Sequence, residues 1–434
     1  MARRYWLETL GCPKNQVDSD KIAGRLAGDG FRPAAEVAEA DLVVVNTCAF
    51  IDDARRESLE TVDSLAAQRR DGAQLVVTGC LAERAGSRLL EDRPEIDAVA
   101  GFGEPIALGP TRRGLRRSLK VAGGAPVPHL DLLNMPRPPA QSPWAYVKIA
   151  EGCDRRCGYC AIPSFRGPQR SRSAESILAE IEALGAREVV LVAQDLAAYG
   201  RDGGRGERRL VPLVEAARSL VPWVRLLYLY PSDLTDDLIA AILATDVAYF
   251  DLSLQHASRP LLRRMRRWGD GERFAARIAE IRRQAPHAAF RSNFIVGYPG
   301  ETEEDHDALL AFVSEAELDW VGVFAYSAEE GTYAVDLDGE VPGPLVAERM
   351  AELREVCDEI TERRRRSLVG STATVLVDRP GRARSHREAP EIDGIVEVPS
   401  DLTTGSFATV EITGAAGVDL TARPLAGAGA GEAR

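Results

Sequence analysis

The chain of 434 residues lacks any apolar run long enough to cross a membrane. A transmembrane helix needs about 18 or more consecutive apolar residues. The first residues, "MARRYWLETLGCPKN", also lack the apolar segment of a signal peptide. We therefore expect a cytoplasmic protein that makes no contact with membranes. At about 150 residues per domain, the length suggests about three domains.

Histidine is scarce, and disulfides are not expected. The sequence has five histidines and seven cysteines. Disulfides are rare in a reducing cytoplasm, where clustered cysteines bind metals or act in catalysis. The formal net charge of −12 means that the molecule as a whole repels nucleic acid and favours a basic protein partner.

Three strand–loop–helix patterns fill the first part of the chain. The apolar stretches "RYWLETLG", "DLVVVNTC" and "QLVVTGC" each precede a helical pattern. This alternation predicts an α/β domain with a doubly wound parallel sheet in residues 1–120. Residues 109–143 are rich in Pro, Gly and Arg, which indicates an extended connection, with the linker itself at 121–140. A solvated linker explains its arginines better than a nucleic-acid patch does.

Six further strand patterns alternate with helical patterns in residues 141–367. The strands are "WAYVKIA", "EVVLVAQ", "VRLLYLY", "AYFDLSL", "AAFRSNFIVG" and "DWVGVFAYS". The clearest helix, "SAESILAEIEALG", has Ser173 as its N-cap and ends at Gly185. Six such units predict a partial (β/α)6 barrel of parallel strands, since a full barrel needs eight.

Short strand patterns without helices begin at residue 368. "TATVLVD", "DGIVEVP" and "FATVEITGAAGVDLTARPL" are separated by turn residues. They predict a small antiparallel β-barrel or sandwich of about 60 residues in a domain at 368–434. The last residues, "AGAGAGEAR", are expected to be disordered.

The stretch "EGCDRRCGYCAIPSFRGPQRSR" carries three cysteines, Cys153, Cys157 and Cys160. They follow the first barrel strand, at the end of a parallel barrel that carries active sites. Thiolates select zinc or iron–sulfur clusters, and zinc would need a fourth ligand, whereas no histidine lies in this stretch. A 4Fe–4S cluster held by three cysteines leaves one iron open to a ligand. We favour the cluster over zinc and over free structural cysteines.

A second set of three cysteines is dispersed in the sequence. Cys12, Cys48 and Cys80 each follow a predicted strand of the N-terminal sheet. The carboxyl ends of parallel strands meet at one edge of a sheet, so these thiols are expected to converge. A second cluster with an open iron is favoured over three half-buried structural cysteines. Cys357 lies in a helical pattern and is interpreted as a core residue.

The spacing C-x3-C-x2-C after a first barrel strand resembles the radical S-adenosylmethionine (SAM) superfamily. The resemblance implies that the open iron binds the amino and carboxylate groups of SAM. An electron from the cluster then cleaves SAM and releases a 5′-deoxyadenosyl radical. The position of Tyr159 is often aromatic in that superfamily and lies near the adenine.

With its two three-cysteine sets and terminal β-barrel, essentially the whole chain resembles the radical SAM methylthiotransferases. The resemblance implies two 4Fe–4S clusters, SAM as methyl donor and radical source, and a C-terminal TRAM domain. These enzymes replace a C–H bond with a C–S–CH3 group, and the sulfur is carried at the open iron of the N-terminal cluster. No general acid or base is expected among the catalytic residues.

Members of this family modify adenosine in tRNA or an aspartate in the small-subunit ribosomal protein S-twelve. "LGCPKNQVDSD", "EGCDRRCGYCAIPSFRGPQRSR" and "YSAEEGTYA" resemble the second branch, whereas the tRNA enzymes more often show "GCxMN", "CNxxCxxC" and "YSxRxGT". Residues 367–426 contain five Arg and eight Asp or Glu, a charge of 5 − 8 = −3, which suits a basic protein better than tRNA. We expect methylthiolation at the aspartate β-carbon, giving 3-methylthioaspartate. A tRNA methylthiotransferase and a metal-containing RNA-binding protein without enzyme activity remain as alternatives.

Other polar residues and glycines stand at predicted strand ends or beside the cysteine motif. The expected SAM contacts are Gln194, Asp195, Gln255 and Gly297, and the expected substrate contacts are Arg166, Arg172, Glu329 and Glu330. Ordinary turn chemistry explains each strand-end residue about as well. The arginine-rich stretch at 259–283 suggests a weak RNA contact, although a solvated helix face is the preferred interpretation.

Overall fold

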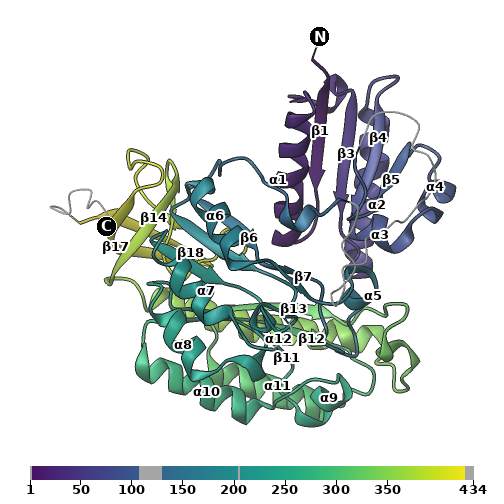
Figure 1. Cartoon of the computed structure of the whole chain (residues 1–434). Helices are drawn as coiled ribbons and strands as arrows, with labels where there is room; N and C mark the ends of the chain where they lie inside the picture. The colour runs from purple at the N-terminus through teal and green to yellow at the C-terminus, as the bar shows by residue number, and fades with distance from the viewer. Residues whose placement is uncertain (1, 107–129, 204–205, 426–434) are drawn as a thin grey trace.

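The computed structural model describes residues 2–106, 130–203 and 206–425. Figure 1 shows an N-terminal sheet, a central set of strands with helices outside, and a small C-terminal barrel. Part of the predicted linker at 121–140 lies outside the described residues, and so does the whole predicted disordered tail.

The N-terminal part is a five-stranded parallel sheet in the order β2-β1-β3-β4-β5. Its strands are β1 (Arg4–Thr9), β2 (Arg32–Pro33), β3 (Leu42–Thr47), β4 (Gln74–Gly79) and β5 (Ala98–Ala100). Its helices are α1 (Pro13–Gly28), α2 (Asp52–Gln68), α3 (Cys80–Ala85) and α4 (Arg88–Asp92). Every residue of β3 is buried, as expected for a strand covered on both faces. The predicted doubly wound sheet is confirmed.

The central part has six parallel strands, in two three-stranded sheets, β6-β9-β10 and β11-β12-β13. They are β6 (Trp144–Lys148), β9 (Glu188–Val192), β10 (Trp223–Leu226), β11 (Tyr249–Gln255), β12 (Ala289–Val296) and β13 (Trp320–Ala325). A parallel bridge between Leu229 and Leu252 joins the two sheets. The predicted partial (β/α)6 barrel is confirmed.

Helices cover the outside of this barrel (Figure 1). They are α6 (Ala174–Leu184), α7 (Leu210–Ala217), α8 (Asp236–Leu243), α9 (Arg259–Arg264), α10 (Gly271–Gln284), α11 (Glu303–Ala316) and α12 (Gly343–Arg366). The Ser173 side chain caps α6, and Gly185 ends it in the left-handed conformation. The loop after β6 contains β7 (Ala150–Glu151), α5 (Ile162–Arg166) and β8 (Arg170–Ser171).

The C-terminal part is a closed five-stranded barrel in the order β14-β15-β16-β18-β17. Its strands are β14 (Thr372–Arg379), β15 (Arg382–Arg384), β16 (Val396–Glu397), β17 (Phe407–Ala416) and β18 (Asp419–Pro424). The predicted small barrel is confirmed, but β16 and β18 pair in parallel. A closed ring with an odd number of strands cannot be antiparallel at every pairing.

The segment between β15 and β16 fastens this barrel to the amino ends of the central strands. Asp393 accepts a hydrogen bond from the Tyr249 hydroxyl (2.6 Å), and Arg291 lies 3.5 Å from it. The indole of Trp320 donates to the carbonyl of Arg387 (2.7 Å). Because this segment occupies the amino ends, a site for substrate belongs at the carboxyl ends.

The pH dependence of stability tests how Asp393 attaches the C-terminal barrel to the central strands. Burial raises the pKa of its carboxyl from 3.8 to about 6, although Arg291 and Tyr249 act to lower it. A raised folded-state pKa gives stability that is complete below pH 3.8 and is lost as the pH rises through about 6. Relative to Asp393→Asn, the wild-type free energy of unfolding should therefore fall by about 2 kcal/mol between pH 4 and pH 7.

Thermal unfolding at several pH values measures this difference. Asp401→Asn, on the exposed surface of the same barrel, is the matched control and should track the wild type. A constant difference between Asp393→Asn and the wild type across this range would contradict the prediction.

Candidate active site

The three dispersed cysteines lie together at the carboxyl edge of the N-terminal sheet. Cys12 precedes α1, Cys48 follows β3, and Cys80 begins α3 directly after β4. Gly11, with a φ of 92°, allows the Cys12 loop to approach Cys48, because a Cβ at Gly11 would lie 2.9 Å from the Cys48 sulfur. The sequence-based expectation that these loops converge agrees with this placement.

Lys14 and Arg166 lower the pKa of one N-terminal thiol, that of Cys12, whereas burial raises the pKa values of Cys48 and Cys80. Burial acts to raise the pKa of Cys12, but Lys14, Arg166 and backbone hydrogen bonds outweigh it, so that pKa is lowered. Burial raises the pKa of Cys48 to about 12, with further contributions from the nearby Cys80 and Cys12. The guanidinium of Arg166 donates to the Cys80 sulfur at 3.0 Å. Three adjacent thiols beside buried cations form a donor set that fits an iron–sulfur cluster.

The second set lies on the loop after β6. Burial raises the pKa of Cys153 to about 11 and that of Cys160 to about 12, and the thiols of this set reinforce one another. Arg267 donates to the Cys157 sulfur at 3.3 Å. Gly152 is required where the loop crosses β8, because a Cβ there would lie 2.1 Å from the carbonyl oxygen of Pro168. This donor set also fits a cluster held by three cysteines.

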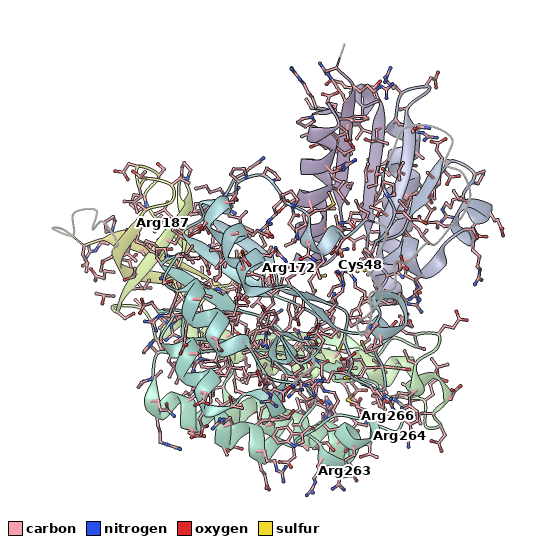
Figure 2. The ribbon with its side chains drawn as sticks, viewed as in Figure 1. Cys48, Arg172, Arg187, Arg263, Arg264 and Arg266 are labelled. Carbon is pink, nitrogen blue, oxygen red and sulfur yellow. The ribbon has the colours of Figure 1, made fainter. Side chains whose placement is uncertain are left out.

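A buried polar network connects the two sets. Arg166, at the end of α5, donates to Cys80, to Asn15 (2.7 Å) and to Glu151 (2.6 Å). Glu151 stands two residues before Cys153. Burial acts to raise its pKa, but Arg166 and Lys148 hold that pKa well below the ordinary value. The N-terminal set is therefore joined to the strand β7 that leads into the loop set, and Figure 2 shows Cys48 where the N-terminal sheet meets the barrel.

Three buried polar atoms near the carboxyl ends of barrel strands have no hydrogen-bond partner among the described residues. They are Gln194 Oε1, Asp195 Oδ1 and Asn293 Oδ1. Buried polar atoms are almost always paired, so an unpaired one near the ends of the barrel strands is available to a polar ligand. They fit a cofactor as polar as SAM. Sequence analysis missed Asn293, although an amide within the apolar strand "FRSNFIV" is a usable signal.

The remaining predicted SAM contacts lie at the same end of the barrel. Burial raises the pKa of Tyr159 well above its ordinary value, with Arg267 opposing and Cys157 adding to the rise. Gln255 ends β11 with a φ of 74°. Gly297 follows β12, and a Cβ there would lie 2.6 Å from Val346 of α12, so this glycine also serves helix packing. Their assignment to SAM stays a prediction.

Three of the four predicted substrate contacts already have partners within the protein. Arg166 belongs to the network described above. Arg172 forms an ion pair with Glu180 of α6 at 2.7 Å. Glu329 is buried between Arg84 (2.5 Å) and Arg55 of the N-terminal part. The fourth, Glu330, is exposed.

Sequence analysis missed several charged and polar residues around the cysteine sets, because most of their partners are distant in the chain. Arg155, inside the motif itself, pairs with Asp195 at 2.6 Å and also with Asp233, and its guanidinium lies 3.7 Å from the centre of the Tyr230 ring. The others are Lys14, Asn15, Glu151 and Arg267.

Neither a single-ion site nor a membrane-spanning helix occurs among the described residues. No group of three or more His, Cys, Asp or Glu side chains in them is arranged to hold one metal ion. No helix in the described ranges is long and apolar enough to span a membrane. The cytoplasmic location stays a prediction.

Comparison with known families defines the class of enzyme. Three family models match in succession: the uncharacterized protein family UPF0004 at residues 4–101, the radical SAM superfamily at 147–313 and the TRAM domain at 369–425. A solved structure of the radical SAM methyltransferase TsrM from Kitasatospora setae has a similar fold. Its TM-score is 0.50 with 16% identity, covering 75% of each chain. The chain is a radical SAM methylthiotransferase.

Relatives that align over nearly the whole chain are more specific. "Ribosomal protein uS12 methylthiotransferase RimO" from Moorella thermoacetica is 43% identical over 93% of this chain and 95% of its own length. The protein of that name from Cutibacterium acnes is 40% identical over 96% and 97%. The chain belongs to the ribosomal protein uS12 methylthiotransferase family. The cofactors predicted from the sequence, two 4Fe–4S clusters and SAM, are those of such an enzyme.

The position of Arg166 generates a prediction about stability. Arg166→Met removes the partner of Glu151 and leaves buried charge poorly compensated, so the free energy of unfolding should fall by about 3 kcal/mol. Arg156→Met, an exposed arginine of the same loop, is the matched control and should change it little. Thermal or denaturant unfolding measures both. An unchanged stability in Arg166→Met, with weaker substrate binding, would instead favour the sequence-based role as a substrate contact.

Proposed function

We propose that this enzyme methylthiolates the β-carbon of an aspartate in ribosomal protein uS12, giving 3-methylthioaspartate. The observation that carries the proposal is the junction of two three-cysteine sets, joined through Arg166 and Glu151. A radical source and a sulfur carrier must act on the same carbon, so both must reach one place. Membership of the uS12 methylthiotransferase family supports the choice of protein substrate.

The two cysteine sets have separate roles in this proposal. The loop set of Cys153, Cys157 and Cys160 holds the cluster that binds SAM, and the set of Cys12, Cys48 and Cys80 holds the cluster that carries sulfur. When bound, these cofactors supply the adenosyl radical, the methyl group and the transferable sulfur. The polar atoms of Gln194, Asp195 and Asn293 orient SAM, and Tyr159 forms a wall of its pocket.

Charge supports a basic protein substrate. The whole chain carries −12, and the terminal barrel carries −3 over residues 367–426. Such a surface attracts a basic ribosomal protein and repels the phosphates of tRNA. Against this, Arg263 and Arg266 are exposed at the end of α9 (Figure 2), so tRNA remains the alternative substrate and a weak RNA contact stays a prediction.

Substrate choice is tested by incubating the reconstituted enzyme with SAM and reductant, with uS12 or with tRNA. We expect mass spectrometry to find one methylthio group on one aspartate of uS12 and none on tRNA. A gain on tRNA adenosine without a gain on uS12 would replace this proposal with the alternative. Zinc in place of iron, with no cleavage of SAM, would favour the non-enzymatic RNA-binding protein.

The division of roles is tested by replacing each cysteine set with alanine. The variant Cys12→Ala, Cys48→Ala, Cys80→Ala should fall from about eight to about four irons per chain. It should retain reductive SAM cleavage and lose methylthio transfer, whereas alanines at the loop set should abolish both. Cys357→Ala, in α12 and outside both sets, is the control and should keep both. Loss of SAM cleavage in the first variant would show that the roles are assigned wrongly.

A further inference from the structure

Lys14 is a buried cation that no carboxylate of the described residues pairs with. It lies in the first turn of α1, two residues after Cys12, and only 8% of it is exposed. Among the residues that the structure describes, no carboxylate oxygen lies within 4.0 Å of its ammonium. The other buried lysines, Lys21 and Lys148, each form a buried ion pair. An unpaired buried charge is costly, so a lone ammonium here points to a ligand that completes it.

The ring of Tyr228 holds this ammonium in place. The Nζ atom of Lys14 lies 3.3 Å from the ring centre, within the range of a cation–π attraction. Tyr228 follows β10 and has a φ of 65°, in the left-handed region that an aromatic residue rarely adopts. Its amide donates to Asp251 of β11 at 2.9 Å, which stabilises that conformation. Backbone strain that the surroundings maintain is a common feature of functional sites.

The carboxylate of Asp251 has other partners. One of its oxygens faces Arg291 at 3.1 Å, and the other accepts the Tyr228 amide. It influences Lys14 electrostatically, as do the thiols of Cys12 and Cys80. The ammonium therefore stands between the N-terminal cysteine set and the barrel strands, with its own coordination incomplete.

We propose that Lys14 binds the side-chain carboxylate of the substrate aspartate and so selects an acidic side chain over a neutral one. This inference rests on the proposed function. The carboxylate of an aspartate is bonded directly to its β-carbon, so anchoring the carboxylate fixes the carbon that must receive sulfur. A neutral amide or an adenine ring in the same place would leave the ammonium buried and unpaired, which penalises such substrates.

The test is a double-mutant cycle read out by binding. One arm uses uS12 and its variant in which the aspartate found modified is replaced by Asn. The other arm uses the reconstituted holoenzyme as wild type, Lys14→Met and Lys14→Arg, without reductant, so that no turnover occurs. Fluorescence anisotropy of labelled uS12 measures each dissociation constant. We expect the wild type to bind the Asp form at least tenfold more tightly than the Asn form, Lys14→Met to lose this preference, and Lys14→Arg to keep most of it.

Matched variants separate this role from a general effect of charge or folding. Arg218→Met removes one positive charge from the exposed end of α7 and should keep the full preference. Tyr228→Leu keeps the ammonium but removes its platform, and should reduce the preference severalfold. If Lys14→Met does not retain its iron, Tyr228→Leu tests the proposal instead, by the same comparison of its binding to the Asp and Asn forms of uS12.

Two outcomes overturn the proposal. One is a full preference for the Asp form in Lys14→Met. The other is an equal loss of binding to both forms, because an ammonium that merely balances the cysteine set has no reason to distinguish Asp from Asn. If the wild type modifies no aspartate of uS12, the proposed function itself fails, and this result is visible before the cycle begins.

Discussion

The buried ion pairs between α1 and the first barrel strand are the interactions on which the active-site arrangement depends. Lys148 of β6 pairs with Asp18 of α1, and Arg166 pairs with Glu151 while it contacts Cys80. Buried charges are tolerated only with their partners in place, so the N-terminal sheet can dock on the barrel in few ways. In the observed arrangement the sheet edge that carries one cysteine set faces the barrel end that carries the other. The proposed action of two cofactors on one substrate carbon depends on this docking.

The C-terminal barrel contacts the amino ends of the central strands, opposite the end that carries the cysteine loop. The segment between its β15 and β16 fills the amino end of the six-stranded barrel, with Asp393 beside Tyr249 and Arg384 pairing with Glu188 at 2.7 Å. An open barrel would otherwise expose the side chains at that end, among them Tyr249 and Trp320, which pack in one hydrophobic cluster with Leu376 and Ala389. The terminal barrel thus closes one end of the catalytic domain. Its acidic charge lies on a body that is fixed relative to the active site.

Much of the fold and the outline of the site could be predicted from sequence. The six central strands were identified because buried parallel strands give short apolar runs that alternate with helical periodicity. The convergence of Cys12, Cys48 and Cys80 followed from their shared position after strands. The parallel pairing of β16 with β18 was missed, because strand order in a barrel is not encoded in any local pattern. The partners of Arg172 and Glu329 were missed because the sequence around a charged side chain does not show whether that side chain faces solvent, substrate or an opposite charge far along the chain.

The sequence by itself determined the strands and helices, the two sets of three cysteines and the class of chemistry, since all of these follow from local patterns and from where each cysteine stands relative to a strand. Only the tertiary structure decided which charges neutralise one another. Arg166 meets Asn15 across 151 positions and Cys80 across 86, and no periodicity records such pairs. The same packing leaves Lys14 on the ring of Tyr228, with no carboxylate partner among the described residues. Burial makes each of these charges depend on its surroundings, and those surroundings exist only once the domains have docked.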